Sequence, residues 1–138
     1  MEPRPWVIDP RPLEPGQRRK ARILAADDNP DMRRILRAWL APRHDFLAVP
    51  DGEALLAATV ETLPDLVIVD VRMPGVDGWG VVSELRLRAG ARRLRVLVVS
   101  GSVGDLEFLA RGNSGADGFL PKPLTREVLL AHVDELLR

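Results

Sequence analysis

The sequence predicts an α/β fold, a doubly wound sheet of five parallel strands covered on both faces by five helices. Two observations carry this prediction. Runs that are apolar at every position, such as 66–69 and 96–99, indicate strands buried on both faces, because a half-exposed strand needs polar residues at every second position. Segments with apolar residues at helical spacing alternate with these runs. That alternation is typical of right-handed crossovers between parallel strands.

Composition limits the classes of function. The chain has 138 residues and no cysteine, so we expect one folded domain without disulfides. Lys+Arg and Asp+Glu both number 20, and the basic runs 18–20 and 92–95 border apolar runs as solvated connectors do. We therefore expect no direct binding of nucleic acid. No apolar stretch is long enough to cross a bilayer, which predicts a soluble, cytoplasmic protein without membrane contact.

Residues 1–20 differ from the rest of the chain. They contain five prolines and no apolar periodicity, which favours an extended or disordered arm in front of a domain over residues 21–138. Trp6-Val7-Ile8 is the apolar part of this arm. Its docking on the domain or on a partner is the alternative to an irregular tail.

The first half of the domain is expected to hold strands over 23–26 and 46–49, each followed by a helix. Asn29 can cap the first helix, whose apolar side consists of Met32, Ile35, Leu36, Trp39 and Leu40. Asp51 can cap the second helix, which is expected to continue to about Thr62 with Leu55, Leu56 and Val60 as its apolar residues.

The second half is expected to hold the other three strands, over 66–70, 96–99 and 118–120. Asp77 can cap a helix that ends near Gly90, and a helix over 105–111 is surrounded by glycines. Thr125 can cap a terminal helix, whose inward-facing residues are expected to be Val128, Leu129, Val133, Leu136 and Leu137.

Polar side chains stand at the ends of four predicted strands. Asp27 and Asp28 follow the first strand, Asp70 ends the third, Ser100 follows the fourth and Lys122 follows the last. Parallel strands end at one edge of a sheet, so these side chains are expected to be neighbours. Three carboxylates together raise their own pKa values unless a cation compensates. Mg²⁺ fits such a site, because it takes hard oxygen ligands and shares phosphate oxygens.

This set of groups indicates phosphoryl transfer. Asp70 would be the nucleophile and form an aspartyl phosphate. Lys122 could pair with Asp70 at rest and with a phosphate oxygen afterwards, and the Ser100 hydroxyl could donate to another oxygen. Singly, the same residues could be helix caps, a turn residue and a surface charge. Their expected meeting at one edge favours a site.

Further motifs accompany these residues. They are Met73-Pro74-Gly75, Asp77-Gly78 and the stretch from Gly115 to Pro123. With them, the segment from residue 21 to the C-terminus resembles the response-regulator receiver domains of two-component signalling, of the chemotaxis-regulator type. The resemblance implies a flavodoxin-like sheet with strand order 2-1-3-4-5 and a cis peptide bond between Lys122 and Pro123.

The resemblance also implies roles for the site residues. Asp70 would be the phosphoacceptor, taking its phosphoryl group from a histidine kinase or a histidine phosphotransfer protein. Asp28, Asp70 and the backbone carbonyl of Arg72 would bind Mg²⁺ directly, and Asp27 largely through water. The protein would catalyse only its own phosphorylation and dephosphorylation, so it is not expected to be an enzyme acting on other substrates.

Ser100 and Phe119 would form the switch pair, changing the surface of the fourth helix, last strand and last helix. Serine replaces the commoner threonine and keeps the hydroxyl, and Phe119 lacks the hydroxyl of a tyrosine. Arg72 could lie over the phosphate and alter its hydrolysis. Arg72 also stands where aspartate-dependent phosphatases carry a second aspartate, which disfavours that alternative, and the intact acceptor set disfavours a module that is never phosphorylated.

The sequence leaves the output open. The domain could be a free-standing regulator or phosphorelay intermediate, or a receiver excised from a larger response regulator or hybrid histidine kinase. A homodimer through the last helices is also possible, although solvated charges explain His132, Asp134, Glu135 and Arg138 equally well.

Overall fold

A computed structural model of the chain describes residues 20–60, 63–89, 94–102, 104, 105 and 115–138. Nearly all of the expected arm and most of the helix expected over 105–111 lie outside the described residues. Within them, five parallel strands form one sheet in the order β2-β1-β3-β4-β5, which confirms the predicted order. The strands are β1 (Arg22–Ala26), β2 (Asp45–Val49), β3 (Leu66–Asp70), β4 (Arg95–Ser100) and β5 (Gly118–Pro121).

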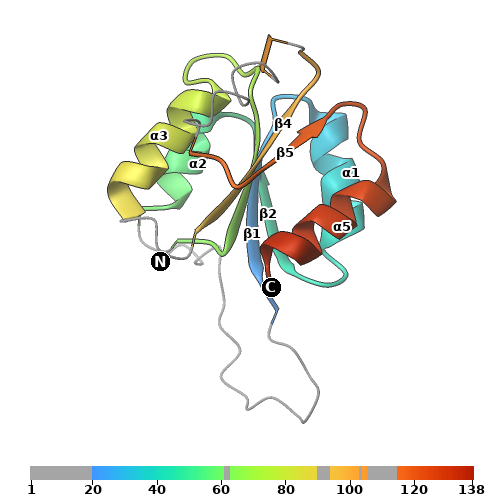
Figure 1. The fold of residues 1–138 in the computed structure, drawn as a ribbon. Coiled ribbons are helices and arrows are strands. Elements are labelled where there is room, and N and C mark those ends of the chain that lie inside the picture. The colour runs from blue at the N-terminus through green and yellow to red at the C-terminus, as the bar shows by residue number, and fades with distance from the viewer. Residues whose placement is uncertain (1–19, 61–62, 90–93, 103, 106–114) are drawn as a thin grey trace.

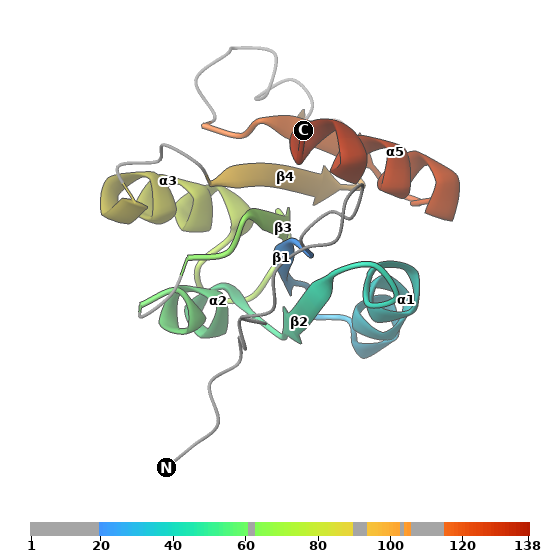
Figure 2. The same cartoon turned by 90° about the horizontal axis from the view of Figure 1, so that it is seen from below.

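Helices cover both faces of this sheet, as Figure 1 and the view from below in Figure 2 show. α1 (Pro30–Leu40) and α5 (Arg126–Leu136) lie on one face, and α2 (Gly52–Ala58) and α3 (Gly78–Ala89) lie on the other. These four helices agree with four of the five predicted ones. The chain is therefore a three-layer α/β protein in the doubly wound arrangement.

The apolar strands supply two cores, one for each face. In β3, Val67 and Val69 pack toward α2 and α3, whereas Leu66 and Ile68 pack toward α1 and α5. The strands β1 and β4 alternate in the same way. This alternation is the reason why the sequence of a central parallel strand is apolar at every position.

Side-chain caps begin the helices where the sequence predicts them. Asn29 accepts a hydrogen bond from the N–H of Asp31, at the start of α1. The other three capping side chains, each accepting from the N–H three residues ahead, are Asp51, Asp77 and Thr125. These bonds satisfy N–H groups that lack partners within the helix.

Three apolar residues do not lie where the sequence predicts. α2 ends at Ala58 instead of near Thr62, because Thr59 turns its hydroxyl back onto the carbonyl of Leu56 at 2.8 Å. Val60 is therefore 70% exposed. Ile35 and Val128 are also exposed. The buried residues of each helix begin one position later and are four residues apart, and these residues pack against the sheet. They are Leu36 and Leu40 in α1, and Leu129 and Val133 in α5.

Within the described ranges, none of the helices combines the length and the apolar composition that crossing a membrane requires.

Candidate functional site

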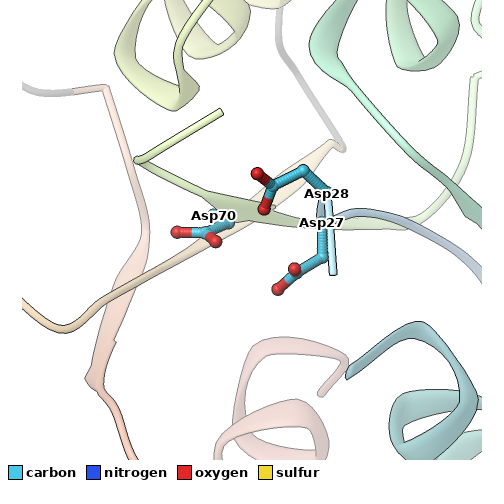
Figure 3. A group of neighbouring side chains, drawn as sticks. All are labelled: Asp27, Asp28 and Asp70. Atoms are coloured by element: carbon cyan, nitrogen blue, oxygen red, sulfur yellow. The ribbon is translucent and has the colours of Figure 1, made fainter. Parts of the chain in front are cut away.

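Three carboxylates meet at the carboxyl ends of β1 and β3. One carboxylate oxygen from each of Asp27, Asp28 and Asp70 lies within 4.8 Å of the others (Figure 3). The register of the sheet produces this arrangement, because Ala26 of β1 pairs with Val69 of β3 and the acidic residues follow directly. Asp27 and Asp70 are buried, and Asp28 is exposed.

Backbone groups hold the two buried carboxylates in place. The N–H of Asn29 donates to Asp27 Oδ1 at 2.9 Å, and the N–H of Arg72 donates to Asp70 Oδ1 at 3.1 Å. Arg33 of α1 donates to the backbone carbonyl of Asp27 at 2.8 Å, a contact that the sequence analysis missed. In each carboxylate, the second oxygen, Oδ2, faces Lys122.

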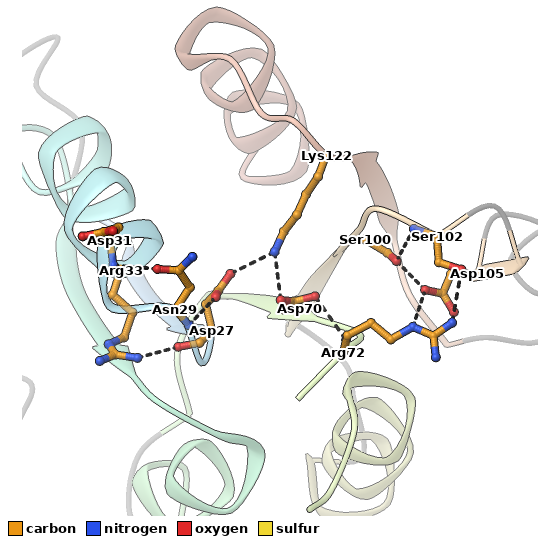
Figure 4. A network of polar contacts seen from close by, with 10 residues as sticks. All are labelled: Asp27, Asn29, Asp31, Arg33, Asp70, Arg72, Ser100, Ser102, Asp105 and Lys122. Carbon is orange, nitrogen blue, oxygen red and sulfur yellow. Dashed lines mark hydrogen bonds and ion pairs between the residues drawn. The ribbon is translucent and has the colours of Figure 1, made fainter. Parts of the chain in front are cut away.

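Lys122 joins the two buried carboxylates (Figure 4). Its Nζ lies 2.9 Å from Asp70 Oδ2 and 3.4 Å from Asp27 Oδ2. The N–H of Lys122 donates to the carbonyl of Ser100 at 2.9 Å, which fixes the residue beside the end of β4. The peptide bond from Lys122 to Pro123 is cis, as the family resemblance implies.

The electrostatics of the site show an excess of negative charge. Burial raises the pKa of Asp27, and the charge of Asp70 adds to this, although the Asn29 N–H and Lys122 oppose it. Burial alone would lower the pKa of Lys122, but the hydrogen bond to Asp70 and the charge of Asp27 outweigh burial, and this pKa is raised. Three carboxylates thus lie together, and the ammonium group of Lys122 contacts two of them. The site favours a further cation.

A second polar cluster lies at the end of β4. The Ser100 hydroxyl donates to the buried carboxylate of Asp105, and the N–H of Ser102 donates to Ser100 Oγ at 3.0 Å. Arg72 extends toward this cluster, with Nη2 at 3.1 Å from Ser102 Oγ and Nε at 3.5 Å from Asp105 Oδ2 (Figure 4). From the sequence, Arg72 could lie over the phosphate, which stays a prediction, and Asp105 was expected only at the start of a helix.

A family model described as "Response regulator receiver domain" matches residues 23–134. The chain belongs to this family. Among its relatives, the response regulator MprA of Mycobacterium leprae is 37% identical over 118 residues, which are 85% of this chain and 51% of that protein. The response regulator PleD of Caulobacter vibrioides is 35% identical over 119 residues, 86% of this chain and 26% of that protein. The chain thus spans about half the length of the first relative and about a quarter of the second.

Solved structures agree with this assignment. The chemotaxis protein CheY4 of Vibrio cholerae superposes with a TM-score of 0.78 at 26% identity, covering 86% of this chain and 99% of that one. The response regulator TrrA of Thermotoga maritima, whose structure contains Mg²⁺ and BeF, superposes with a TM-score of 0.75 at 27% identity, covering 85% and 99%. The chain is thus a receiver domain of a response regulator in two-component signalling, a class that histidine kinases phosphorylate.

The roles expected for Phe119 and for the backbone carbonyl of Arg72 stay predictions. Phe119, the second member of the expected switch pair, is partly buried and packs against the core beneath α2 and α3. The backbone carbonyl of Arg72, an expected Mg²⁺ ligand, belongs to an exposed residue two positions after Asp70, between the core residues Val71 and Met73.

Proposed function

We propose that this receiver domain accepts a phosphoryl group on Asp70 from a histidine kinase or a histidine phosphotransfer protein. The observation that supports the proposal most strongly is the position of the Asp70 carboxylate. It is buried at a strand end, bonded to Lys122 Nζ at 2.9 Å, and within 4.8 Å of two further carboxylates. Such a carboxylate is held in place as a nucleophile, with charged groups ready for the oxygens of an incoming phosphoryl group.

The donor set fits Mg²⁺. Three carboxylates at one strand edge offer hard oxygen ligands, and the exposed position of Asp28 leaves the cluster open to water. We propose that Asp28, Asp70 and the backbone carbonyl of Arg72 hold the ion, and that Asp27 contributes largely through water. When bound, Mg²⁺ supplies the positive charge that neutralises the phosphoryl oxygens.

Each remaining residue then has a defined task. An oxygen of the Asp70 carboxylate forms a bond to phosphorus while the bond from phosphorus to the donor histidine nitrogen breaks. The Lys122 ammonium group, bonded to Asp70 beforehand, is placed to bind an oxygen of the transferred group. The Ser100 hydroxyl donates to another oxygen, and Phe119 follows its movement. The surface around β5 and α5 changes as a result, and a protein partner responds to that surface.

Phosphorylation with a small-molecule donor tests the proposal directly. The purified protein is incubated with acetyl phosphate and Mg²⁺ and its intact mass is measured. The wild type is expected to gain one phosphoryl group, and Asp70→Asn none. Asp45→Asn, which removes a carboxylate at the opposite edge of the sheet, serves as the matched control and should be labelled like the wild type. A wild type that gains no mass, or equal labelling of Asp70→Asn, contradicts the proposal.

A further inference from the structure

We propose that Asp105 is a positioning residue of the phosphorylation site, which holds the Ser100 hydroxyl and the Arg72 guanidinium away from Asp70 in the resting state. The inference deepens the proposed function and rests on it. In the unphosphorylated state, Asp105 would bind the same two side chains that a phosphoryl group on Asp70 would attract.

The Ser100 hydroxyl cannot donate to Asp105 and to a phosphoryl group at the same time. A hydroxyl has one hydrogen to donate and accepts through its lone pairs. In this structure the hydrogen of Ser100 goes to the Asp105 carboxylate, and one lone pair accepts the N–H of Ser102. The same hydrogen is needed for a phosphoryl oxygen on Asp70. Ser100 must therefore leave Asp105 before it can bind the phosphoryl group.

The Asp105 carboxylate is buried. The residue is 6% exposed, so water does not readily replace a hydrogen bond that its carboxylate loses. Bonds to an ionised carboxylate are also stronger than bonds between neutral groups. The release of Ser100 consequently has a free-energy cost that is absent in a protein with no carboxylate at this position.

The Arg72 side chain extends away from Asp70 toward Asp105. Its backbone N–H contacts Asp70, but its guanidinium lies with Ser102 and Asp105 (Figure 4). The Arg72 side chain is 69% exposed, so solvent screening makes its ion pair with Asp105 weak and easily rearranged. Arg72 can thus follow a new negative charge on Asp70, or remain with Asp105 and compensate for the loss of Ser100.

These contacts place one buried carboxylate in competition with the phosphoryl group for two partners. Asp105 therefore sets how far the equilibrium lies toward the resting state, without touching the phosphoryl group itself. Its removal should favour the phosphorylated conformation, and this effect should pass through Ser100.

The test is a double-mutant cycle with beryllofluoride, a mimic of the phosphoryl group. The affinity for beryllofluoride at saturating Mg²⁺ is measured by amide NMR for the wild type, Asp105→Asn, Ser100→Ala and the double variant. Asp105→Asn is expected to bind about tenfold more tightly, because a neutral amide holds the hydroxyl less strongly than a carboxylate. In the Ser100→Ala background the same change should have less than about a twofold effect.

Asp117→Asn is the matched control. This aspartate is also paired with an arginine, Arg86, but lies at the opposite end of the sheet, so its change should leave beryllofluoride affinity as in the wild type. Unchanged or weaker binding by Asp105→Asn, or an equal gain in both backgrounds, overturns the inference. If Asp105→Asn does not fold, Asp105→Ser is measured in the same cycle by the same criteria. A wild type that binds no beryllofluoride overturns the proposed function, and this inference with it.

Discussion

Gly78 is expected to be the least replaceable glycine near the site. It begins α3 directly beside the end of β3, and its N–H donates to the carbonyl of Val71 at 3.0 Å. A Cβ at this position would lie 2.7 Å from the carbonyl oxygen of Asp70, from the Cα of Val71 and from a side-chain carbon of Val69. Each distance is 0.7 Å short of the 3.4 Å at which ordinary contact begins.

Two of these three atoms belong to the backbone, so a rotamer change of one side chain cannot relieve the overlap. Gly78→Ala must move α3 away from β3, or move the segment that carries Asp70. Overpacking of this kind costs about 1–3 kcal/mol. We therefore expect Gly78→Ala to lower the free energy of unfolding by about 2 kcal/mol, measured by urea denaturation.

Gly101→Ala provides the matched comparison. A Cβ on Gly101 would lie 3.8 Å from the Cβ of Lys122, which is an ordinary contact. This variant is expected to change the free energy of unfolding by less than about 1 kcal/mol, and a small gain is expected where an alanine restricts the unfolded chain. Equal stability of Gly78→Ala and Gly101→Ala would refute the steric reasoning.

Three further predictions concern charge, pH and metal binding. Arg86→Met should lower the free energy of unfolding, measured by urea denaturation, by about 1–3 kcal/mol. The reason is that the Arg86 guanidinium donates to Gly115 O, Leu94 O and Asp117 Oδ2 at 2.7–2.8 Å. A loss below about 0.5 kcal/mol contradicts this prediction. Burial lowers the pKa of His44, although the charge of Asp134 opposes this. The folded state therefore favours the neutral imidazole. Its contribution to stability is present above the unfolded pKa of about 6.5 and should be lost as the pH falls through the lower folded pKa. His44→Gln should reduce this loss between about pH 7.5 and 5.5, and an identical pH profile of the unfolding free energy would show that His44 is not its source. Mg²⁺ at a concentration one hundred times its Kd should stabilise the wild type by about 2.7 kcal/mol, measured by thermal unfolding. Asp28→Asn should lose most of this gain. An equal gain in both proteins would exclude Asp28 as a ligand.

The sequence predicted the strands well because buried parallel strands carry a strong signal. Leu66 to Asp70 is apolar up to its last residue, and β3 has the predicted bounds. Helix starts were also predictable, since a capping side chain acts on N–H groups only two or three residues away. The meeting of Asp27, Asp70 and Lys122 followed from topology alone, because parallel strands end at one edge.

Features that depend on the hydrogen bond of a single side chain were not predictable in the same way. Val60 continues the helical pattern of α2, but Thr59 ends the helix by a local hydrogen bond that competes with helix propagation. Asp105 looks like a helix-start aspartate in a glycine-rich stretch, and only the return of the chain after β4 brings it to Ser100. The contact of the Arg72 side chain with Asp105 was not predictable either, because it joins residues from the ends of two different strands.

The hydrogen bond from Lys122 to Asp27 joins residues 95 positions apart, and that from Lys122 to Asp70 spans 52. Lys122 directly follows β5, which stands at the edge of the sheet and pairs with β4. Contacts of such long range close long loops of the chain, which costs conformational entropy and slows folding. The complete proposed acceptor site accordingly requires the finished fold, and a nascent or truncated chain that lacks Lys122 would present Asp70 without its ion-pair partner. On the proposed function, competence to accept a phosphoryl group is in this way tied to the completion of folding.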